Sequence, residues 1–362
     1  MEAIKRFVEC LIPDTRCNLK CSYCYVIQEN RRTESLSRFQ YSPDHIGRAL
    51  SVNRLGGVCF VSICGAGETL MPKETLLIVK CILQQGHYVN ITTNGTLSKR
   101  FDELLSMNSQ LLKRLHFSFS FHYLELKRMG HLDAFFDNIQ KVKKYGCSYI
   151  VQFNLCDEYI PFLDEIKLLC EEKAGAAPQV AVTRNVHVLP ISLLTAHSRD
   201  EYEKYGSIFD SPLFRFTLKN FMVKRREFCY AGIWSCVLNL STGTMKKCYD
   251  STASQNIFAD LRRPIIFRSI GNNCKSPYCM NSSHFMSLGV IPSIATPSYA
   301  ELRDRKQAEW MTPQVRSFLD GKLYKANPEY SSFRKIHVNL KEITLYYVRE
   351  FVRRLKGLLS NV

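Results

Sequence analysis

The strongest constraint on the fold is a regular alternation of short apolar runs and helical patterns over the first half of the chain. The runs are rich in β-branched and aromatic residues, which favour strands. Helix starts and stops lie between them, such as Ser42-Pro43-Asp44 before 44–54, Pro72 before a helix that stops at Gly86, and "TLSKRFDELLS" from Thr96. Such alternation requires crossover connections and a parallel sheet, arranged as a three-quarter barrel or as a doubly wound sheet. The six expected strands cover residues 6–12, 57–64, 88–93, 115–121, 148–155 and 179–184.

Three cysteines follow directly after the first expected strand, in "DTRCNLKCSYCY" at residues 14–25. In either architecture active sites gather at the carboxyl ends of the strands, so this loop is a candidate site. Thiolates of this kind hold iron-sulfur clusters. Because a cubane cluster has four irons, three cysteines leave one iron free to bind a ligand directly. The alternative is a structural zinc site completed elsewhere, although such sites favour paired Cys-x-x-Cys knuckles.

The spacing Cys-x3-Cys-x2-Cys, with the aromatic Tyr23 before the third cysteine, resembles the signature of the radical S-adenosylmethionine (SAM) superfamily. The resemblance implies a partial (β/α)6 TIM-like barrel. It also implies that Cys17, Cys21 and Cys24 are the catalytic and metal-ligating residues, and that they hold a [4Fe-4S] cluster whose fourth iron binds the amino and carboxylate groups of SAM. An electron from the cluster then cleaves SAM to methionine and a 5'-deoxyadenosyl radical, which abstracts hydrogen from a substrate.

Further SAM contacts are expected at the ends of the later strands. In "CGAGET", Gly65 and Gly67 lack Cβ atoms and let the backbone approach a ligand closely. This stretch resembles the GGE-type motif that binds the SAM amino group in the family, with Ala66 in place of the commoner glycine. The expected cofactor-binding residues are Tyr23, Gly65, Ala66, Gly67, Glu68, Thr93, Asn94, Ser118, Ser120, Asn154 and Arg184. Alternating serines suit a half-buried strand equally well, and His122 is either a general base or an ordinary buried or solvent-facing histidine.

A second cysteine group begins where the alternation stops, after about residue 195. The stretch "VLNLSTGTMKKC" is typical of a β-hairpin with its turn at residues 241–243. Cys229, Gly243 and Cys248 resemble the first half of the SPASM motif, Cys-x(9-15)-Gly-x4-Cys, of many radical SAM enzymes. The later cysteines suffice for one auxiliary [4Fe-4S] cluster, as in the shortened Twitch domain, with the expected ligands Cys229, Cys248, Cys274 and Cys279. A zinc ribbon is the alternative, and Cys236 and His284 are rival ligands.

These features predict three parts of the chain. Residues 1–200 form the radical SAM core, residues 201–290 a SPASM/Twitch-like domain that is cysteine-rich and combines a β-hairpin with helix, and residues 291–362 a helical extension. Within the extension, Ile343 to Leu359 carry an apolar stripe that is typical of docking on a core. Attachment to a membrane surface is the alternative. The remaining members of the fifteen cysteines are scattered through apolar segments and are expected in the core.

Composition and charge limit the class of protein. No apolar run approaches the ~20 residues of a spanning helix, and the N-terminus lacks the apolar run of a signal peptide, so a cytoplasmic protein is expected. The formal net charge is +16, which favours an acidic peptide, a phosphorylated sugar or a nucleotide-linked sugar as substrate. The basic residues are dispersed and accompany no zinc-finger, RNP-type or helix-turn-helix signature, which argues against dedicated nucleic-acid binding.

The sequence thus predicts a radical SAM oxidoreductase. A four-cysteine auxiliary cluster is coordinatively closed, which suits electron uptake from a substrate radical and net oxidation. The substrate is a peptide or protein to be matured, or an anionic sugar-type alcohol to be dehydrogenated, and flavodoxin or ferredoxin is the expected electron donor. Sixteen residues precede Cys17, so no N-terminal leader-recognition domain is expected, and a peptide substrate would need a separate recognition partner or none. The alternative from another class is a zinc-stabilised, basic α/β nucleic-acid-binding module without redox chemistry.

Overall fold

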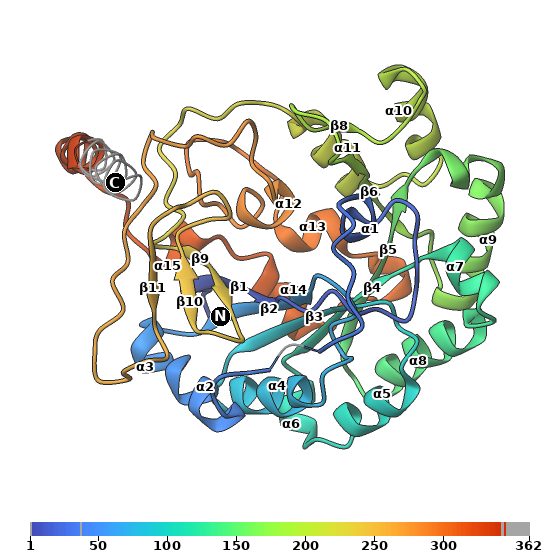
Figure 1. Cartoon of the computed structure of the whole chain (residues 1–362), viewed down its shortest axis with the longest axis horizontal. Coiled ribbons are helices and arrows are strands. Elements are labelled where there is room, and N and C mark those ends of the chain that lie inside the picture. Colours follow the sequence, from blue (N-terminus) through green and yellow to red (C-terminus); the bar gives the residue numbers. More distant parts are fainter. Residues whose placement is uncertain (1, 37, 342–343, 345–362) are drawn as a thin grey trace, which may run out of the picture.

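A computed structural model of the chain describes residues 2–36, 38–341 and 344, and one nine-stranded sheet organises it (Figure 1). Six parallel strands pair in the order in which they follow one another along the chain. Sequential order is that of a barrel, whereas a doubly wound sheet reverses its order at a switch point. The predicted partial (β/α)6 barrel is therefore confirmed. Its strands are β1 (Arg6–Ile12), β2 (Cys59–Gly65), β3 (Tyr88–Thr93), β4 (Leu115–Ser120), β5 (Ser148–Leu155) and β6 (Gln179–Val182).

Helices cover the convex face of this sheet (Figure 1). The helix predicted over 44–54 is divided in two, because Ser51 has an extended backbone conformation between its halves. The helix predicted after Pro72 stops before Gly86, whose φ of 89° is in the left-handed region that favours glycine. The elements between the barrel strands are α1 (Tyr25–Gln28), α2 (Pro43–Ala49), α3 (Val52–Leu55), α4 (Glu74–Gln84), α5 (Ser98–Leu105), α6 (Ser109–Leu112), α7 (Tyr123–Arg128), α8 (Leu132–Lys144), the 3-10 helix η1 (Asp157–Phe162) and α9 (Leu163–Ala174).

The predicted hairpin extends the barrel sheet beyond its first strand. Strand β9 (Ser235–Asn239) pairs in parallel with β1, and β10 (Thr244–Lys246) and β11 (Ser254–Asn256) continue the sheet outward. The hairpin turn contains Gly243 with φ of 75°, as the sequence predicted. Before it come the two-stranded sheet of β7 (Arg184–Asn185) and β8 (Ser192–Leu193), and the helices α10 (Arg199–Ser207) and α11 (Pro212–Asn220). The last predicted barrel strand thus ends before residue 184, which begins β7.

The segment from residue 291 onward closes the barrel at the amino-terminal ends of its strands. The backbone N–H of Tyr149 donates to the carbonyl of Trp310 over 2.7 Å, the ring of Tyr88 stacks on Phe318, and Asn327 donates to the carbonyl of Lys5 over 2.8 Å. The segment is therefore part of the core. Its elements, with the helix before it, are α12 (Ser282–Phe285), α13 (Tyr299–Arg303), the 3-10 helix η2 (Lys306–Ala308), α14 (Pro313–Leu319) and α15 (Leu323–Ala326).

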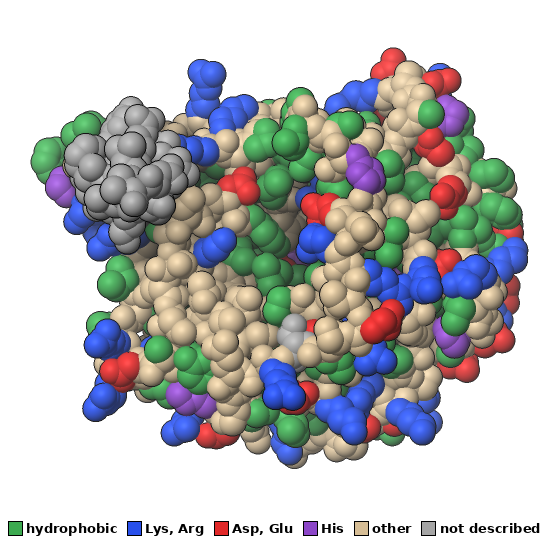
Figure 2. Space-filling view, in the orientation of Figure 1, with side chains coloured by type: hydrophobic (Ala, Val, Ile, Leu, Met, Phe, Trp, Pro, Cys, Tyr) green, Lys and Arg blue, Asp and Glu red, His purple; other side chains and the backbone are tan. Residues whose placement is uncertain are grey.

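Two predictions concern the remainder of the chain and its surface. The apolar stripe from Ile343 to Leu359 lies outside the described residues except for Thr344. None of the helices in the described ranges combines the length and the apolar character that crossing a bilayer requires. One face of the molecule is hollowed near its centre, and Lys and Arg side chains are spread around its rim (Figure 2).

Candidate functional site

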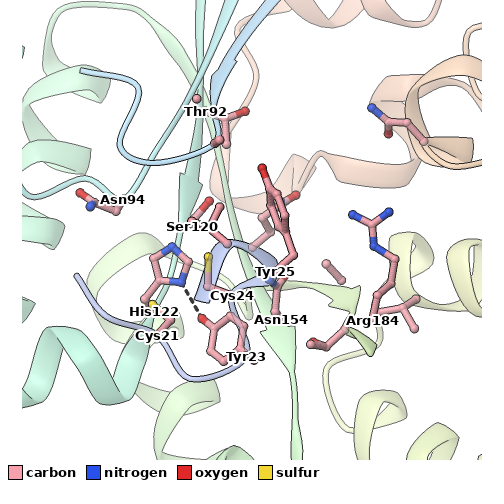
Figure 3. A pocket seen from close by; sticks show the side chains of 18 of the residues that line it. Cys21, Tyr23, Cys24, Tyr25, Thr92, Asn94, Ser120, His122, Asn154 and Arg184 are labelled. Carbon is pink, nitrogen blue, oxygen red and sulfur yellow. Dashed lines mark hydrogen bonds between the residues drawn. The ribbon is translucent and has the colours of Figure 1, made fainter. Parts of the chain in front are cut away.

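A cavity of about 390 Å³ lies at the carboxyl ends of the barrel strands (Figure 3). Its wall is built from the cysteine loop after β1, the turn after β2 and the polar ends of the later strands. Most of the residues that the sequence singled out are brought together here. Those that line the cavity are Cys17, Cys21, Tyr23, Cys24, Gly65, Ala66, Gly67, Glu68, Thr93, Asn94, Ser120, Asn154 and Arg184.

The cysteine loop is held in shape by hydrogen bonds from its own chain and from Arg32. The Arg32 guanidinium donates to the carbonyls of Cys17 and Leu19, over 2.8 and 3.3 Å. The Cys17 sulfur is approached by two donors, the backbone N–H of Leu19 at 3.4 Å and the side-chain amide of Asn94 at 3.6 Å. Hydrogen bonds to sulfur stabilise negative charge on it and tune the potential of a cluster that the sulfur holds.

The ionisation of these thiols indicates what they can hold. Burial raises the pKa of Cys17 to about 11, and the Glu68 carboxylate adds to the shift. Burial likewise raises the pKa of Cys21, with Cys17 and Cys24 adding to it. Both groups are therefore protonated thiols at neutral pH unless a cation stands beside them. The donor set fits an iron-sulfur cluster, whose irons supply that positive charge and in which each cysteine binds a separate iron. In the described ranges, no three His, Cys, Asp or Glu side chains are grouped around a position for a single metal ion.

The glycine turn after β2 packs against the cysteine loop. A Cβ atom on Gly67 would lie 2.0 Å from the carbonyl oxygen of Arg16, and one on Gly65 would lie 3.0 Å from the carbonyl of Gly67. The missing Cβ of Gly67 thus makes room for the backbone of the cysteine loop, while Gly67 itself also lines the cavity. The N–H groups of Ala66, Gly67 and Glu68 donate to the carbonyls of Ile12, Asp14 and Arg16.

Glu68 joins the ends of β2 and β3. Its buried carboxylate accepts hydrogen bonds from the hydroxyl of Thr93 at 2.7 Å, the N–H of Asn94 at 2.8 Å and the N–H of Leu70 at 3.0 Å. Burial raises the pKa of Glu68, and these three bonds oppose the shift. Since Asn94 also donates to the Cys17 sulfur, the carboxylate supports the cysteine loop through Asn94. The turn of Thr93 and Asn94 was expected as a SAM contact. It also links Glu68 to the cysteine loop.

The two serines of β4 differ in depth. Ser120 lines the cavity, whereas Ser118 does not. The Ser118 hydroxyl donates to the side-chain oxygen of Asn90 over 2.9 Å, and Asn90 donates to Ser62 over 3.2 Å. The expectation that Ser118 contacts SAM is therefore not supported by its position, because its hydroxyl is engaged in this buried chain of hydrogen bonds.

The aromatic residue before the third cysteine is bonded to the histidine that follows β4. The Tyr23 hydroxyl lies 2.5 Å from Nδ1 of His122 (Figure 3), and the Tyr159 hydroxyl donates to that of Tyr23 over 3.2 Å. Burial lowers the pKa of His122 to about 4, so its ring is neutral at physiological pH. His122 is thus a half-buried histidine that has a hydrogen-bond partner and lines the cavity.

Part of the cavity wall comes from the chain after residue 210, where no SAM or substrate contact was expected. The run "CMNSSH" after Cys279 was a weak signal, since it places several polar residues next to an expected ligand. Helix α11 also contributes, although the sequence suggested only a mixed basic segment there. The additional lining residues are Thr217, Phe221, Tyr278, Met280, Asn281, Ser282, Ser283, His284 and Arg303.

A second cavity, of about 180 Å³, is lined by four cysteines. Burial raises the pKa of Cys279, and the three other thiols each raise it further, which follows from their closeness. Burial also raises the pKa of Cys248 to about 12. Tyr278 and Met280 line both cavities and stand between them. The four lining cysteines are those that the sequence singled out, Cys229, Cys248, Cys274 and Cys279.

The two rival ligands lie elsewhere. Cys236, on β9, is 1% exposed and packs in the core beside Cys10 and Arg6. His284 lines the first cavity and contacts Asn281 and Arg303. Neither residue lines the four-cysteine cavity.

Comparisons with known proteins agree with this geometry. The sequence model of the Radical SAM superfamily matches residues 11–165. A probable GTP 3',8-cyclase from Methanococcus vannielii is 26% identical over 223 residues, which cover 60% of this chain and 70% of that protein. Among solved structures, SuiB from Streptococcus suis bound to S-adenosylmethionine has a TM-score of 0.50 at 15% identity, over 72% of this chain and 64% of that chain. The structure of anSMEcpe with bound AdoMet has a TM-score of 0.45 at 16% identity, over 70% of this chain and 78% of that chain.

The matched residues 11–165 contain the three-cysteine loop and strands β2 to β5, so the part of the chain that matches the family also builds the cysteine side of the cavity. The likeness to SuiB agrees with the mixed α/β barrel fold. The matched part of this chain spans 64% of the length of SuiB. Members of this family bind a [4Fe-4S] cluster and SAM. The resemblance drawn from "CNLKCSYC" is thereby confirmed over residues 11–165, which form the domain of a radical SAM enzyme.

Proposed function

We propose that this enzyme is a radical SAM oxidoreductase with one auxiliary [4Fe-4S] cluster. The observation that carries the proposal is the pair of cysteine-lined cavities, which share Tyr278 and Met280 as a common wall. When bound, the two clusters supply one-electron chemistry, namely the cleavage of SAM to methionine and a 5'-deoxyadenosyl radical that takes hydrogen from the substrate, and the uptake of an electron from the substrate radical. A dehydrogenation or an oxidative cross-link is the expected outcome.

In the first cavity, the residues of the chain hold the cluster and shape the SAM site. Cys17, Cys21 and Cys24 are the proposed ligands, and Asn94 and the N–H of Leu19 stabilise charge on the Cys17 sulfur. Glu68 keeps the turn of Asn94 against the cysteine loop. The proposed SAM contacts are Tyr23, the turn of residues 65–68, Thr93, Asn94, Ser120, Asn154 and Arg184, which all line this cavity.

In the second cavity, the four thiols fit a coordinatively closed cluster. Burial raises the pKa of Cys229 and Cys248, and the neighbouring thiols add to both shifts, so ionised sulfurs require metal cations beside them. We therefore propose that residues 201–290 are a Twitch-like unit attached to the radical SAM core of residues 1–200. Strand β9 anchors this unit, because it is hydrogen-bonded along β1.

The substrate is proposed to be a peptide or an anionic small molecule, with flavodoxin or ferredoxin as the electron donor. The charge around the first cavity supports an anionic substrate, because three arginines line it and Glu68 is the acidic residue among its lining residues. Both Glu68 oxygens are engaged by hydrogen-bond donors of the protein. The cavity is therefore positive as a whole, which raises the local concentration of anions.

Anaerobic reconstitution tests the proposal against the zinc-stabilised alternative. The enzyme should take up about eight irons and about eight sulfides per chain. It should form 5'-deoxyadenosine from SAM when reduced with dithionite or with reduced flavodoxin. A protein that binds zinc, takes up no iron and leaves SAM intact would support the structural module instead.

A further inference from the structure

Arg303 is the most deeply buried of the three arginines that line the first cavity. It is 1% exposed yet lines the cavity, and in the described ranges it forms no ion pair within 4.0 Å. By contrast, Arg32, which also lines the cavity, lies 3.4 Å from the carboxylate of Glu34. A guanidinium is charged at every physiological pH. Burying it without a counter-ion is costly, so its position calls for an anionic partner.

The contacts of the Arg303 guanidinium inside the protein are with neutral groups. It donates to the carbonyl of Ser283 over 2.9 Å, lies 3.3 Å from Nδ1 of His284, and stands 3.9 Å from the centre of the Tyr299 ring. Arginine has five N–H donors in a planar fork, and these contacts use two of its nitrogen atoms. The fork therefore retains donors for a ligand, and polar residues of the same wall surround it.

The nearest acidic group, Glu9, is engaged elsewhere. Its buried carboxylate accepts from the side-chain amide of Asn281 over 3.1 Å and from the Cys64 thiol over 3.3 Å. The other end of the Asn281 side chain contacts Nδ1 of His284 over 2.6 Å. Glu9 is thus linked to the arginine through Asn281 and His284 and does not pair with it. Burial raises the pKa of Glu9 to about 7, so its carboxyl group is only partly ionised at neutral pH and is not a permanent counter-ion.

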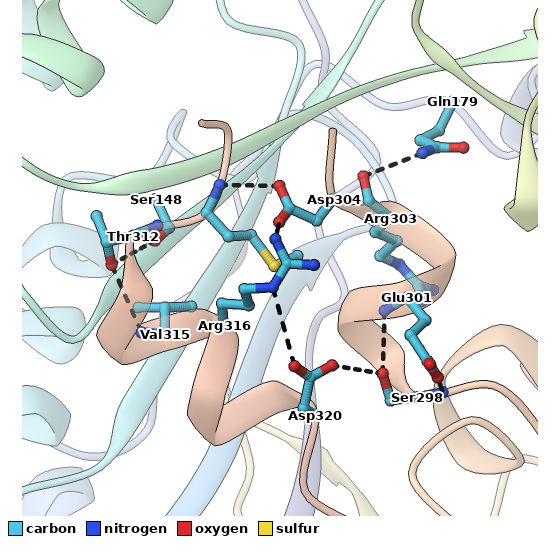
Figure 4. Close-up of polar contacts among 11 residues, drawn as sticks. Ser148, Gln179, Ser298, Glu301, Arg303, Asp304, Thr312, Val315, Arg316 and Asp320 are labelled. Carbon is cyan, nitrogen blue, oxygen red and sulfur yellow. Dashed lines mark hydrogen bonds and ion pairs between the residues drawn. The ribbon is translucent and has the colours of Figure 1, made fainter. Parts of the chain in front are cut away.

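The backbone that carries Arg303 is firmly positioned (Figure 4). Its carbonyl accepts from the side-chain amide of Gln179, the first residue of β6, over 3.1 Å. Helix α13 begins with a capping box between Ser298 and Glu301, and the next residue, Asp304, pairs with Arg316 and accepts from the N–H of Met311. Such support on both sides is typical of a preorganised binding group and not of a mobile surface arginine.

We propose that Arg303 binds an oxyanion of the substrate, a carboxylate or a phosphate, at the wall of the SAM cavity, with Asn281 and Ser283 beside it. The inference rests on the proposed function, since it assumes that SAM and substrate meet in this cavity. The resemblance to the family assigns the SAM carboxylate to the fourth iron, which leaves the anion at Arg303 to the substrate. The substrate class is therefore one whose anionic group enters the barrel interior.

The test uses the reconstituted, SAM-loaded protein and two small probes, inorganic phosphate and succinate, titrated calorimetrically. We expect the protein to bind at least one probe, and Arg303→Met to weaken that binding roughly tenfold or more, because a charge-assisted bidentate contact is lost. Arg303→Lys keeps the positive charge but lacks the planar guanidinium, so its affinity for the probe should lie between those of the wild type and Arg303→Met. It also serves if the Met variant does not fold. A preference for phosphate or for succinate distinguishes a phosphorylated substrate from a carboxylate-bearing one.

Arg305 offers a matched control on the same segment. It is also buried, donates to the carbonyls of Ala177, Phe209 and Asp210, and does not line the cavity. Arg305→Met should therefore bind the probe as the wild type does and still cleave SAM. If neither probe binds, or if the probes bind equally well to the wild type and to the Arg303 variants, the inference is wrong. The proposed function still stands in that case, provided that the wild type cleaves SAM. A wild type that takes up no iron and cleaves no SAM would instead refute the proposed function.

Discussion

The two cysteine sites are built in opposite ways. The first draws three thiols from a single loop, Cys17 to Cys24, at the end of one strand. The second draws four thiols from separate segments between Cys229 and Cys279, which flank the hairpin strand β9 that pairs with β1. A local sequence is enough to specify the first site, whereas the second depends on the tertiary fold. In the proposed function the difference also divides the chemistry, because three ligands would leave an iron open to SAM and four would close the auxiliary cluster.

At both sites the ionisation of the thiols depends on a metal cation. Burial raises the pKa of Cys17 to about 11 and that of Cys248 to about 12, so in neither place does the protein alone ionise the thiols. In the proposed enzyme, metal cations would supply the missing positive charge, so binding of each cluster would be coupled to proton release. Variants that remove one ligand from each site test whether the two sites are independent.

Removing a ligand from the first site should have the largest effect. In Cys24→Ala, two thiols remain on the loop, and we expect formation of 5'-deoxyadenosine to be abolished, with iron falling from about eight to about four per chain. Chromatography of the reduced reaction mixture and iron analysis measure both. Cys147→Ala is the matched control, since Cys147 is 3% exposed and lines neither cavity. Wild-type formation of deoxyadenosine by Cys24→Ala would refute the assignment.

Removing a ligand from the second site should separate SAM cleavage from turnover. We expect Cys248→Ala to lose about four irons, to retain some uncoupled cleavage of SAM, and to stop conversion of the substrate. Cys236→Ala is the control, because Cys236 is a buried cysteine that lies in the core outside this cavity. It should keep about eight irons. Full turnover by Cys248→Ala would show that the second site has no redox role.

The sequence predicted the first site better than the surroundings that support it. Strands β1, β3 and β5 begin and end where the apolar runs do, since buried parallel strands are read directly from such runs. Alternation placed Ser118 and Ser120 on one face but could not tell their depth. Nor could it tell that Gly67 faces the backbone of the cysteine loop, because that contact joins two loops distant in the sequence.

The segment after residue 291 was unreadable for a related reason. Its helices α13, α14 and α15 have five, seven and four residues. These lengths are too short to display a helical period. Their order is set by contacts with the starts of β1, β3 and β5. Arg303 is therefore a residue whose role follows only from the fold, in contrast with Cys17.

Gly67→Ala tests how closely the first site depends on its neighbouring turn. The new Cβ would lie 2.0 Å from the carbonyl of Arg16, so the cysteine loop must shift. We expect a loss of about 3 kcal/mol in the free energy of unfolding, together with weaker SAM binding. Gly130→Ala is the control, because Gly130 has φ of 66° but no atom within 4 Å of an added Cβ. It should lose about 1–2 kcal/mol, from backbone strain alone. Gly67 is not among the glycines with positive φ, so its loss comes from the close contact, and an unchanged free energy of unfolding in Gly67→Ala would mean that this contact carries no energy.

The smallest predicted effect lies at His116 on β4, which is 1% exposed and faces the charge of Arg303. Burial, followed by Arg303, lowers the pKa of His116 from 6.5 to about 3. As the pH falls below 6.5, the unfolded chain takes up a proton that the folded protein refuses, so this contribution to stability is lost progressively between pH 6.5 and 3. Between pH 7 and pH 5 the loss is about 2 kcal/mol.

His116→Phe removes this contribution, so the free energy of unfolding should depend less on pH in the variant than in the wild type. The measurement is the difference between the two proteins at pH 7 and at pH 5, in which the other titrating groups cancel. Arg303→Met should reduce the same pH dependence in part, because it removes the repulsion that helps to keep His116 neutral. If both variants kept the wild-type dependence, His116 would not be buried beside a positive charge, and the placement of an uncompensated Arg303 in the wall of the first cavity would lose its electrostatic support.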